Sequence, residues 1–185
     1  WLKQLASHLG SVRNGLVVSW PGRIKAQGEL RTQYHHVIDV MPTLLDAAGV
    51  PAPGMVDGVA QQRIDGTSMI YSFDAPGAPS TRRMQYYEIN GNRGIYHDGW
   101  FAAAMGPREP WVGGIPKGAR DWSPDKDVWE LYNLKDDFSQ ANNLAAANPA
   151  KLAELRKRFL VLAEDNKAFP IGAGVWLRLH PEDRI

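Results

Sequence analysis

The clearest apolar pattern in the first half of the chain is a short run at residues 16–20. It reads Leu-Val-Val-Ser-Trp and lies between the turn-forming pairs Asn14-Gly15 and Pro21-Gly22. A β-prone run of this length between turn residues is typical of a buried strand. The sequence therefore predicts a strand at residues 16–20.

A helical pattern follows at residues 39–48. Asp39 stands where an N-cap is expected, and Pro42 falls in the first turn, where its missing N–H costs little. Gly49 suits the left-handed position that ends a helix. The apolar positions Leu44, Leu45 and Ala48 have helical spacing.

The second half of the chain predicts strands and then one long helix. Residues 84–87 and 94–105 are β-prone runs around Asn90-Gly91, which is a strong hairpin signal. Residues 127–134 form a further predicted strand. Asn148-Pro149 opens a helix that we expect to end near residue 165. Its apolar face would consist of Leu152, Leu155, Phe159, Leu162 and Ala163.

These elements divide the chain near residue 80. Strand, connection and helix in residues 1–80 are typical of an α/β fragment, the end of a larger layered domain. Residues 81–185 predict an α+β subdomain, in which a small antiparallel sheet packs on the helix at about 149–165 and an irregular tail follows. Residues 50–83 are rich in Pro, Gly, Asp and Ser and predict a long surface excursion.

Composition narrows the possible functions. The chain has 185 residues and no cysteine, which excludes disulfides, thiolate nucleophiles and zinc sites built on sulfur. Its 21 basic and 20 acidic residues argue against an electrostatic nucleic-acid binder. No apolar stretch has the length of a membrane span, and no leader pattern is present. Because the sequence starts at Trp1 without a methionine, we expect it to be a piece of something larger.

One cluster of basic residues precedes the first predicted strand. Lys3, His8 and Arg13 carry N–H donors that together can clamp an oxyanion such as sulfate or phosphate. On chemistry alone, a solvated charged segment is the preferred interpretation, with the oxyanion site as the alternative.

Two histidines also have acidic neighbours. His35 and Asp39 lie four positions apart, a possible pair of metal ligands, although two ligands do not make a site and the cap interpretation of Asp39 is preferred. His97-Asp98 could be an acid–base pair. Neighbouring strand residues point to opposite faces, however, and Asp98-Gly99 is a turn signal, so a turn is preferred.

Two further features have a chemical and a structural interpretation. Ser80 and Arg82 lie close together in a Pro-rich loop, but with no histidine nearby as a base a solvated connection is preferred over an oxyanion contact. The aromatic residues within 127–143 could form a carbohydrate platform. Packing of Trp129, Leu131 and Tyr132 on the last helix is the preferred alternative.

Taken together, five segments resemble the C-terminal part of the type I sulfatases, the arylsulfatase-like enzymes of the alkaline-phosphatase superfamily. Their order and spacing make the resemblance specific, and it covers essentially residues 1–165. The segments are GSVRNGLVVSWP (10–21), HVIDVMPTLLDAAG (36–49), IDGTSM (64–69), YYEINGNRGIYHDGW (86–100) and VWELYNLKDDFSQANNL (128–144).

The resemblance implies a large α/β domain followed by a subdomain with a four-stranded antiparallel sheet packed on a long terminal helix. It also implies hydrolysis of sulfate esters. In the family a formylglycine made from Cys or Ser in a C/S-x-P-x-R motif attacks sulfur, and a calcium ion held by Asp and Asn orients the sulfate, assisted by Lys and His. A periplasmic or secreted location would suit the family, and the sequence itself leaves the location open.

The resemblance implies few site residues within this chain. Gly77 stands where the nucleophile of the motif would be, so no catalytic residue and no metal ligand is predicted here, and we expect the isolated chain to be inactive and to hold no calcium. Lys3 matches a lysine of the family that contacts sulfate, because it precedes Arg13 by ten positions. His8 is a second candidate for a sulfate contact.

Two alternatives stay open at this point. The parent enzyme could be a related phosphodiester or phosphonate monoester hydrolase, since the segment that distinguishes these reactions is not in this chain. The chain could also be a non-catalytic module for substrate-rim contacts or oligomerisation. Its signature would be a large exposed apolar patch, through which self-association is possible.

Overall fold

The computed structural model describes residues 6–107 and 121–172, which group into two units. The described residues up to Gly15 group with those from Met84 onward, and Leu16–Arg83 form the second unit. The boundary at Met84 lies near the division expected at residue 80, but the N-terminal segment groups with the C-terminal part. The assignment of residues 1–80 and 81–185 to domains of a larger enzyme stays a prediction.

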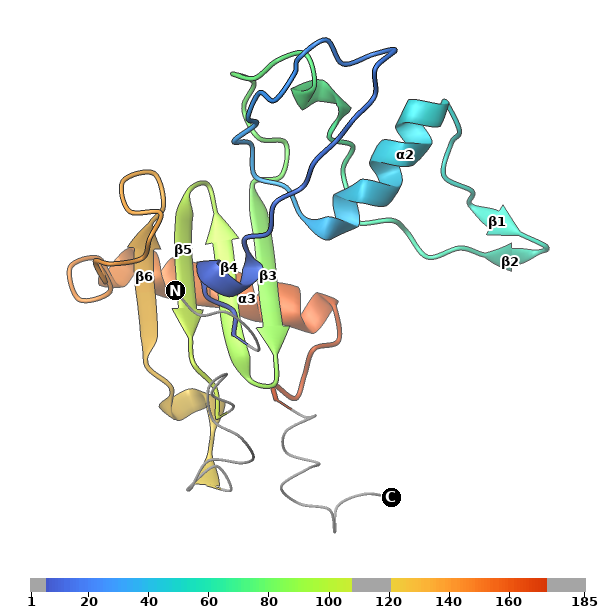
Figure 1. Cartoon of the computed structure of the whole chain (residues 1–185). Helices are drawn as coiled ribbons and strands as arrows, with labels where there is room; N and C mark the ends of the chain where they lie inside the picture. The colour runs from blue at the N-terminus through green and yellow to red at the C-terminus, as the bar shows by residue number, and fades with distance from the viewer. Residues whose placement is uncertain (1–5, 108–120, 173–185) are drawn as a thin grey trace. The chain divides into compact units, whose positions relative to one another are not determined.

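The first unit is built on a four-stranded antiparallel sheet with the order β3-β4-β5-β6 (Figure 1). The predicted strand at 127–134 is present as β6, and the predicted strand at 84–87 extends two residues further than expected. The bounds are Met84–Ile89 for β3, Asn92–His97 for β4, Trp100–Ala104 for β5 and Trp129–Asn133 for β6.

Two-residue turns join the first three strands. Asn90 and Gly91 have φ of 52° and 85°, and Asp98 and Gly99 have φ of 49° and 90°. Positive φ at both central residues matches the right-handed twist of the strands, which is why Asn-Gly and Asp-Gly favour hairpins. The β-prone run at 94–105 therefore contains two strands, β4 and β5, and the preferred turn at Asp98-Gly99 divides them.

Helix α3 (Pro149–Asp165) packs on one face of this sheet. Leu155, Phe159 and Ala163 are fully buried, and Leu152 and Leu162 pack at the edge of the same core, so the predicted helix and its apolar face are confirmed. The strands contribute alternate residues to this core: Ile95, Ala102, Ala104, Trp129 and Leu131. Within the part of the chain that the structure describes, no helix is both long enough and apolar enough to cross a membrane.

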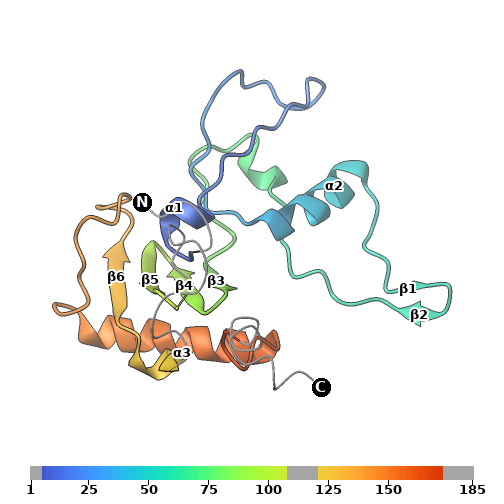
Figure 2. The ribbon, with the colours of Figure 1, turned by 60° about the horizontal axis from the view of Figure 1, so that its bottom comes forward.

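The opposite face of the sheet is covered by the N-terminal segment (Figure 2). This segment consists of residues 6–8 and the one-turn helix α1 (Leu9–Val12). Ala6, Ser7, His8 and Leu9 are all buried. The sheet therefore lies between α3 and a segment that is distant in the sequence, an arrangement that the sequence patterns did not predict.

The second unit contains a helix and little sheet. The 3₁₀ turn η1 (Val37–Asp39) leads into α2 (Val40–Ala48), which ends at Gly49 with φ of 66°. The predicted helix at 39–48 is thus confirmed to within one residue. The remainder holds a short hairpin, β1 (Met55–Val56) with β2 (Val59–Ala60), and the 3₁₀ turn η2 (Ile70–Ser72). The 3₁₀ turn η4 (Pro124–Lys126) precedes β6 in the first unit.

The strand predicted at residues 16–20 is wrong for the described chain. These residues have no assigned strand structure, and Leu16, Val17 and Val18 are 60%, 94% and 45% exposed. A strand needs a neighbour for its backbone hydrogen bonds, and none of the described strands pairs with this run. The run has β-strand composition but lacks a sheet to join.

Candidate functional site

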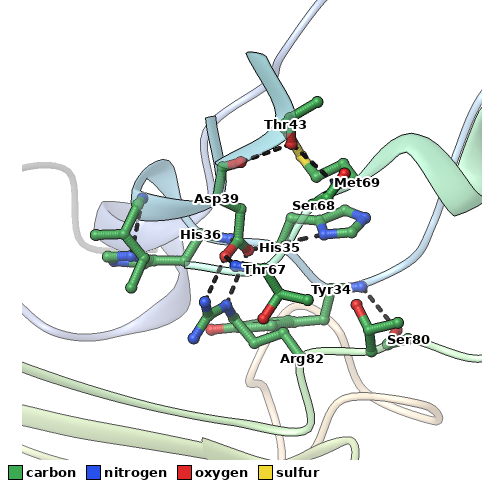
Figure 3. Close-up of polar contacts among 12 residues, drawn as sticks. Tyr34, His35, His36, Asp39, Thr43, Thr67, Ser68, Met69, Ser80 and Arg82 are labelled. Atoms are coloured by element: carbon green, nitrogen blue, oxygen red, sulfur yellow. Dashed lines mark hydrogen bonds and ion pairs between the residues drawn. The ribbon is translucent and has the colours of Figure 1, made fainter. Parts of the chain in front are cut away.

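The most enclosed polar cluster of the second unit centres on Asp39 (Figure 3). The Asp39 side chain is 0% exposed. Its carboxylate accepts hydrogen bonds from Nε and Nη2 of Arg82, the former at 2.8 Å. It also accepts from the backbone N–H groups of Thr67 and His36, each at 2.8 Å. The oxygens of this buried carboxylate are therefore occupied by N–H donors.

The electrostatic balance at Asp39 depends on these donors. Burial by itself would raise the pKa of the Asp39 carboxyl, but the hydrogen bonds from Arg82, Thr67 and His36 lower it, and the net pKa lies below the ordinary value. The carboxylate is thus ionised at neutral pH and paired with the guanidinium of Arg82, whose side chain is only 10% exposed. A buried pair of this kind is costly to break, because either partner alone would be an uncompensated charge.

Hydrogen bonds at Asp39 and Thr43 join two of the sulfatase-like segments. Thr43 Oγ1 donates to the carbonyl of Asp39 at 2.6 Å and accepts from the N–H of Met69 at 2.9 Å. A Cβ at Gly66 would lie 2.0 Å from the carbonyl oxygen of Ile38, so only glycine fits there. The segment at 64–69 is therefore bound to the start of α2, and its residues here have structural roles.

The possible metal pair His35 and Asp39 does not form a metal centre in the described chain. The nearest His35 nitrogen lies 3.8 Å from the Asp39 carboxylate, whose oxygens already accept from N–H groups. No group of three or more His, Cys, Asp or Glu side chains capable of holding a metal is found among the described residues. Asp39 also differs from the predicted N-cap of α2, because its side chain makes no cap bond there. It bonds instead to the N–H of His36, the residue that caps η1.

The predicted Ser80–Arg82 loop has structural contacts as well. Ser80 Oγ accepts from the N–H of Tyr34 at 2.9 Å, and Arg82 binds Asp39. The two side chains thus hold the loop at 80–82 against the segment before α2. The loop is therefore half-buried rather than fully solvated, because the Arg82 side chain reaches Asp39 and is only 10% exposed.

In the first unit, the structure describes His8 but not Lys3, which lies outside the described residues. His8 is 1% exposed, and its Nε2 lies 2.6 Å from Oε2 of Glu130 on β6. The guanidinium of Arg13 lies over the ring of Phe138, 5.5 Å from its centroid. The sulfate contact of His8 stays a prediction, and the contact that the structure records for its Nε2 is with a carboxylate.

Sequence reasoning missed Glu130. Its carboxylate accepts from His8 and, at 2.9 Å, from the Tyr132 hydroxyl. The hydrogen bond from His8 lowers the pKa of Glu130 and outweighs its burial, which acts in the opposite direction. The sequence signal that could have identified Glu130 is its position between the apolar residues Trp129 and Leu131. Because side chains alternate along a strand, an acidic residue there lies on the face away from α3.

The remaining candidates have packing roles in the described chain. Trp129, Leu131 and Tyr132 are buried, which favours packing over a carbohydrate platform. Trp129 and Leu131 share a core with α3 as expected, but the packing of Tyr132 on that helix is wrong, because strand alternation places its side chain on the opposite face with Glu130. His97 Nε2 lies 3.6 Å from Asp98, and its Nδ1 lies 3.8 Å from Glu154 on α3. Burial lowers the pKa of His97, and the preferred turn at Asp98-Gly99 is present.

Comparison with known proteins identifies what these features resemble. The chain is 28% identical over 161 residues to an uncharacterized sulfatase of Schizosaccharomyces pombe, which covers 82% of this chain and 25% of the relative. It is 28% identical over 151 residues to a sulfatase of Formosa agariphila, covering 77% of this chain and 24% of that protein. No family model matches the chain.

A solved structure shares the fold. BT4656, determined in complex with its substrate D-glucosamine-2-N,6-O-disulfate, aligns with a TM-score of 0.54 and 21% identity, over 83% of this chain and 28% of that one. These comparisons confirm the resemblance to sulfatases and the expected fold, a mixed α/β fragment with a small antiparallel sheet packed on a C-terminal helix. The chain spans about a quarter of the length of the curated relatives it matches.

Proposed function

We propose that this chain is the C-terminal part of a sulfatase and that the parent enzyme hydrolyses sulfate esters. The observation that carries the proposal is the sequence similarity to sulfatases over most of the chain, which accounts for only a quarter of those relatives. The sulfated glucosamine that is the substrate of BT4656 supports a sulfate ester as the substrate class.

The catalytic group and the metal would come from other parts of the parent. The sequence contains no cysteine, and its one S-x-P-x-R match, at residues 19–23, overlaps the segment 10–21 that resembles the C-terminal part of the sulfatases, so we assign it no nucleophile. The described residues do not fit calcium either, because they contain no cluster of three or more acidic or histidine ligands. Within the part of the chain that the structure describes, the buried carboxylate of Asp39 accepts hydrogen bonds from N–H donors. We therefore assign no step of the reaction to a metal held by these residues.

The contribution of this chain to the site would be a sulfate contact near its N-terminus. A lysine ammonium or an imidazole N–H can donate to the oxygens of a sulfate group, and charge-assisted hydrogen bonds of this kind are among the stronger ones. Lys3 and His8 are the residues proposed for this contact. Neither could cleave the ester without the nucleophile, so we expect the isolated chain to be inactive.

Exposed apolar residues of the second unit support the idea of a missing neighbour. Val17 is 94% exposed in a β-prone run with no strand partner among the described strands. Val37, Met41 and Leu44 are spaced by four and three positions, as on one helical face, and are 75%, 56% and 60% exposed. We propose that the rest of the sulfatase polypeptide covers these residues, with the run at 16–20 as an added strand.

A turnover assay tests the proposal. The chain and a longer polypeptide that carries it would each be incubated with an aryl sulfate, with a phosphodiester and a phosphonate monoester as comparison substrates. We expect turnover of the sulfate by the longer protein alone. Turnover by this chain would contradict its inactivity, and preference for a phosphorus ester would favour the related hydrolases.

A further inference from the structure

On one face of the four-stranded sheet, small side chains leave room for another segment of the chain to pack closely. Strand pairing aligns Gly94 with Ala103 and Ala103 with Glu130, so these residues form one row across β4, β5 and β6. The row lies on the face opposite α3, because its members alternate with the residues that pack on that helix. Gly94 and Ala103 are small, so this row has free space beside the carboxylate of Glu130.

The N-terminal segment occupies this space. A Cβ at Gly94 would lie 2.6 Å from the carbonyl oxygen of Ser7 and 3.2 Å from Phe101 Cζ. A glycine inside a strand often marks the close approach of another backbone, and here that backbone is the segment before α1. Figure 2 shows α1 and α3 on opposite sides of the sheet.

Three hydrogen bonds hold the segment on this face. Ser7 Oγ donates to the carbonyl of Asn92 at 2.9 Å, and the N–H of Leu9 donates to Gln140 Oε1 at 2.8 Å. Between them, His8 Nε2 lies 2.6 Å from Glu130. Since these partners come from β4, from β6 and from the loop after β6, the segment is attached at three separate places.

Of these three hydrogen bonds, the one between His8 and Glu130 involves a charged group, the Glu130 carboxylate. An ionised carboxylate only accepts hydrogen bonds, so the Nε2 of His8 carries the proton that it donates. The same oxygen, Oε2, accepts from the Tyr132 hydroxyl at 2.9 Å. Tyr132 is itself buried on the adjacent row. The carboxylate is thereby held in one orientation, and it fixes the orientation of the imidazole in turn.

We propose that this sheet face positions the sulfate-binding segment of the parent enzyme, with Glu130 as its positioning residue. The inference rests on the proposed function, which places the sulfate contact at Lys3 and His8. The contacts of Ser7, His8 and Leu9 fix the orientation of the His8 imidazole on the sheet face. Such control is valuable in catalysis, because a displacement of about 1 Å can cost about 100-fold in rate.

Amide hydrogen exchange on this chain tests the positioning. In α1, the N–H groups of Ser11 and Val12 bond to the carbonyl of His8, and that of Arg13 bonds to Leu9. We expect Glu130→Ala to accelerate exchange of these three amides at least about tenfold, because local opening becomes easier, and to leave the β4–β5 amides unchanged. Glu130→Gln, which keeps an acceptor oxygen, should restore much of the protection.

Two further variants keep this test decisive. Glu154→Ala removes a carboxylate from α3 that pairs with Lys151 and Arg158, and it should leave the α1 amides unchanged. If Glu130→Ala does not fold, Tyr132→Phe removes only the hydroxyl that orients the carboxylate and should give a smaller acceleration at the same amides. If Glu130→Ala folds and its α1 amides exchange at the unsubstituted rate, the inference is overturned. If Glu130→Ala does not fold, the same result in Tyr132→Phe overturns it.

The enzymatic part is measured on the longer polypeptide that carries this chain. With a sulfate ester we expect Glu130→Ala to lower kcat/KM at least about tenfold, Glu130→Gln to recover most of it, and Glu154→Ala to have no effect. A normal kcat/KM in folded Glu130→Ala would overturn the positioning role. Absence of sulfatase activity in the unsubstituted protein would instead contradict the proposed function, while the exchange result would still report whether Glu130 anchors the segment.

Discussion

Arg82 and Asp39 form a buried ion pair across 43 positions of the sequence. The guanidinium donates two hydrogen bonds to a carboxylate that has no exposed surface. The pair joins the loop at 80–82 to the start of α2 and thereby closes the second unit. Because the pair is buried, loss of either partner should be costly.

Removal of Arg82 should therefore destabilise the second unit strongly. We expect Arg82→Ala to lower its free energy of unfolding by about 3–5 kcal/mol, because Asp39 would remain as a buried unpaired charge. Urea denaturation followed by circular dichroism measures this change. The control is Arg63→Ala, since Arg63 is 89% exposed in its pair with Asp65 and should change the stability by less than about 1 kcal/mol. Equal effects would contradict the assigned role.

The histidines before α2 should make the second unit sensitive to mild acid. Burial lowers the pKa of His35 and of His36 below 6.5, against the opposing effect of Asp39. Below pH 6.5 the unfolded chain therefore binds more protons at these histidines than the folded chain does. Their contribution to the free energy of unfolding is fully present above pH 6.5 and is lost as the pH falls through their pKa values in the folded chain. The lowered pKa of Asp39 adds a second loss below 3.8.

The urea midpoint should consequently decrease between pH 7 and pH 5. His36→Asn removes one titrating group and keeps a residue suited to an N-cap, so its midpoint should decrease less over the same range. A steeper decrease in that variant would contradict the assignment.

Gly94 provides a test of the close contact beneath the N-terminal segment. Gly94→Ala places a methyl group against the backbone of Ser7, and we expect a loss of about 1–3 kcal/mol, as in other overpacked sites. Gly15→Ala is a matched control, because a Cβ at Gly15 meets no atom within 4 Å. A neutral Gly94→Ala in urea denaturation would mean that the segment does not lie against β4.

Phe159 should dominate the packing between α3 and the sheet. Its ring contacts those of Tyr86 and Trp129, with centroid distances of 5.9 Å and 5.6 Å. We expect Phe159→Ala to cost about 3–5 kcal/mol because it leaves a cavity in the core. Leu160→Ala, at a position 51% exposed, should cost less than about 1 kcal/mol. Thermal unfolding of both variants makes the comparison.

A charged substitution in the exposed run at residues 16–20 should have different effects in this chain and in a longer polypeptide that contains it. In this chain Val17→Lys should change the stability by less than about 0.5 kcal/mol, since Val17 is almost fully exposed. In a longer polypeptide that supplies the neighbouring strand, the same lysine would be buried, and we expect loss of soluble protein. Gln27→Lys, at another exposed position, should be tolerated in both. Soluble yield and light scattering measure the outcome, and tolerance of Val17→Lys in the longer protein would contradict the added strand.

Local signals predicted the regular elements well. The apolar period and Pro149 located α3, the pair Asn90-Gly91 located the first hairpin, and Gly49 marked the end of α2. Each depends on residues within one or two turns of the chain, where backbone conformation and side-chain spacing decide the structure. The run at residues 16–20 has the same kind of local signal, but a strand also requires a partner, and its composition cannot supply one.

The sequence by itself therefore determined the strands of the four-stranded sheet, the helices α2 and α3, the hairpin turns and, through five ordered segments, the resemblance to sulfatases. Only the tertiary structure decided which polar groups meet: Glu130 with His8 across 122 positions, and Arg82 with Asp39 across 43. Such pairs leave no periodic signal, because they depend on how distant elements pack. It is the packed sheet, and no local pattern, that brings the predicted oxyanion-binding segment to Glu130.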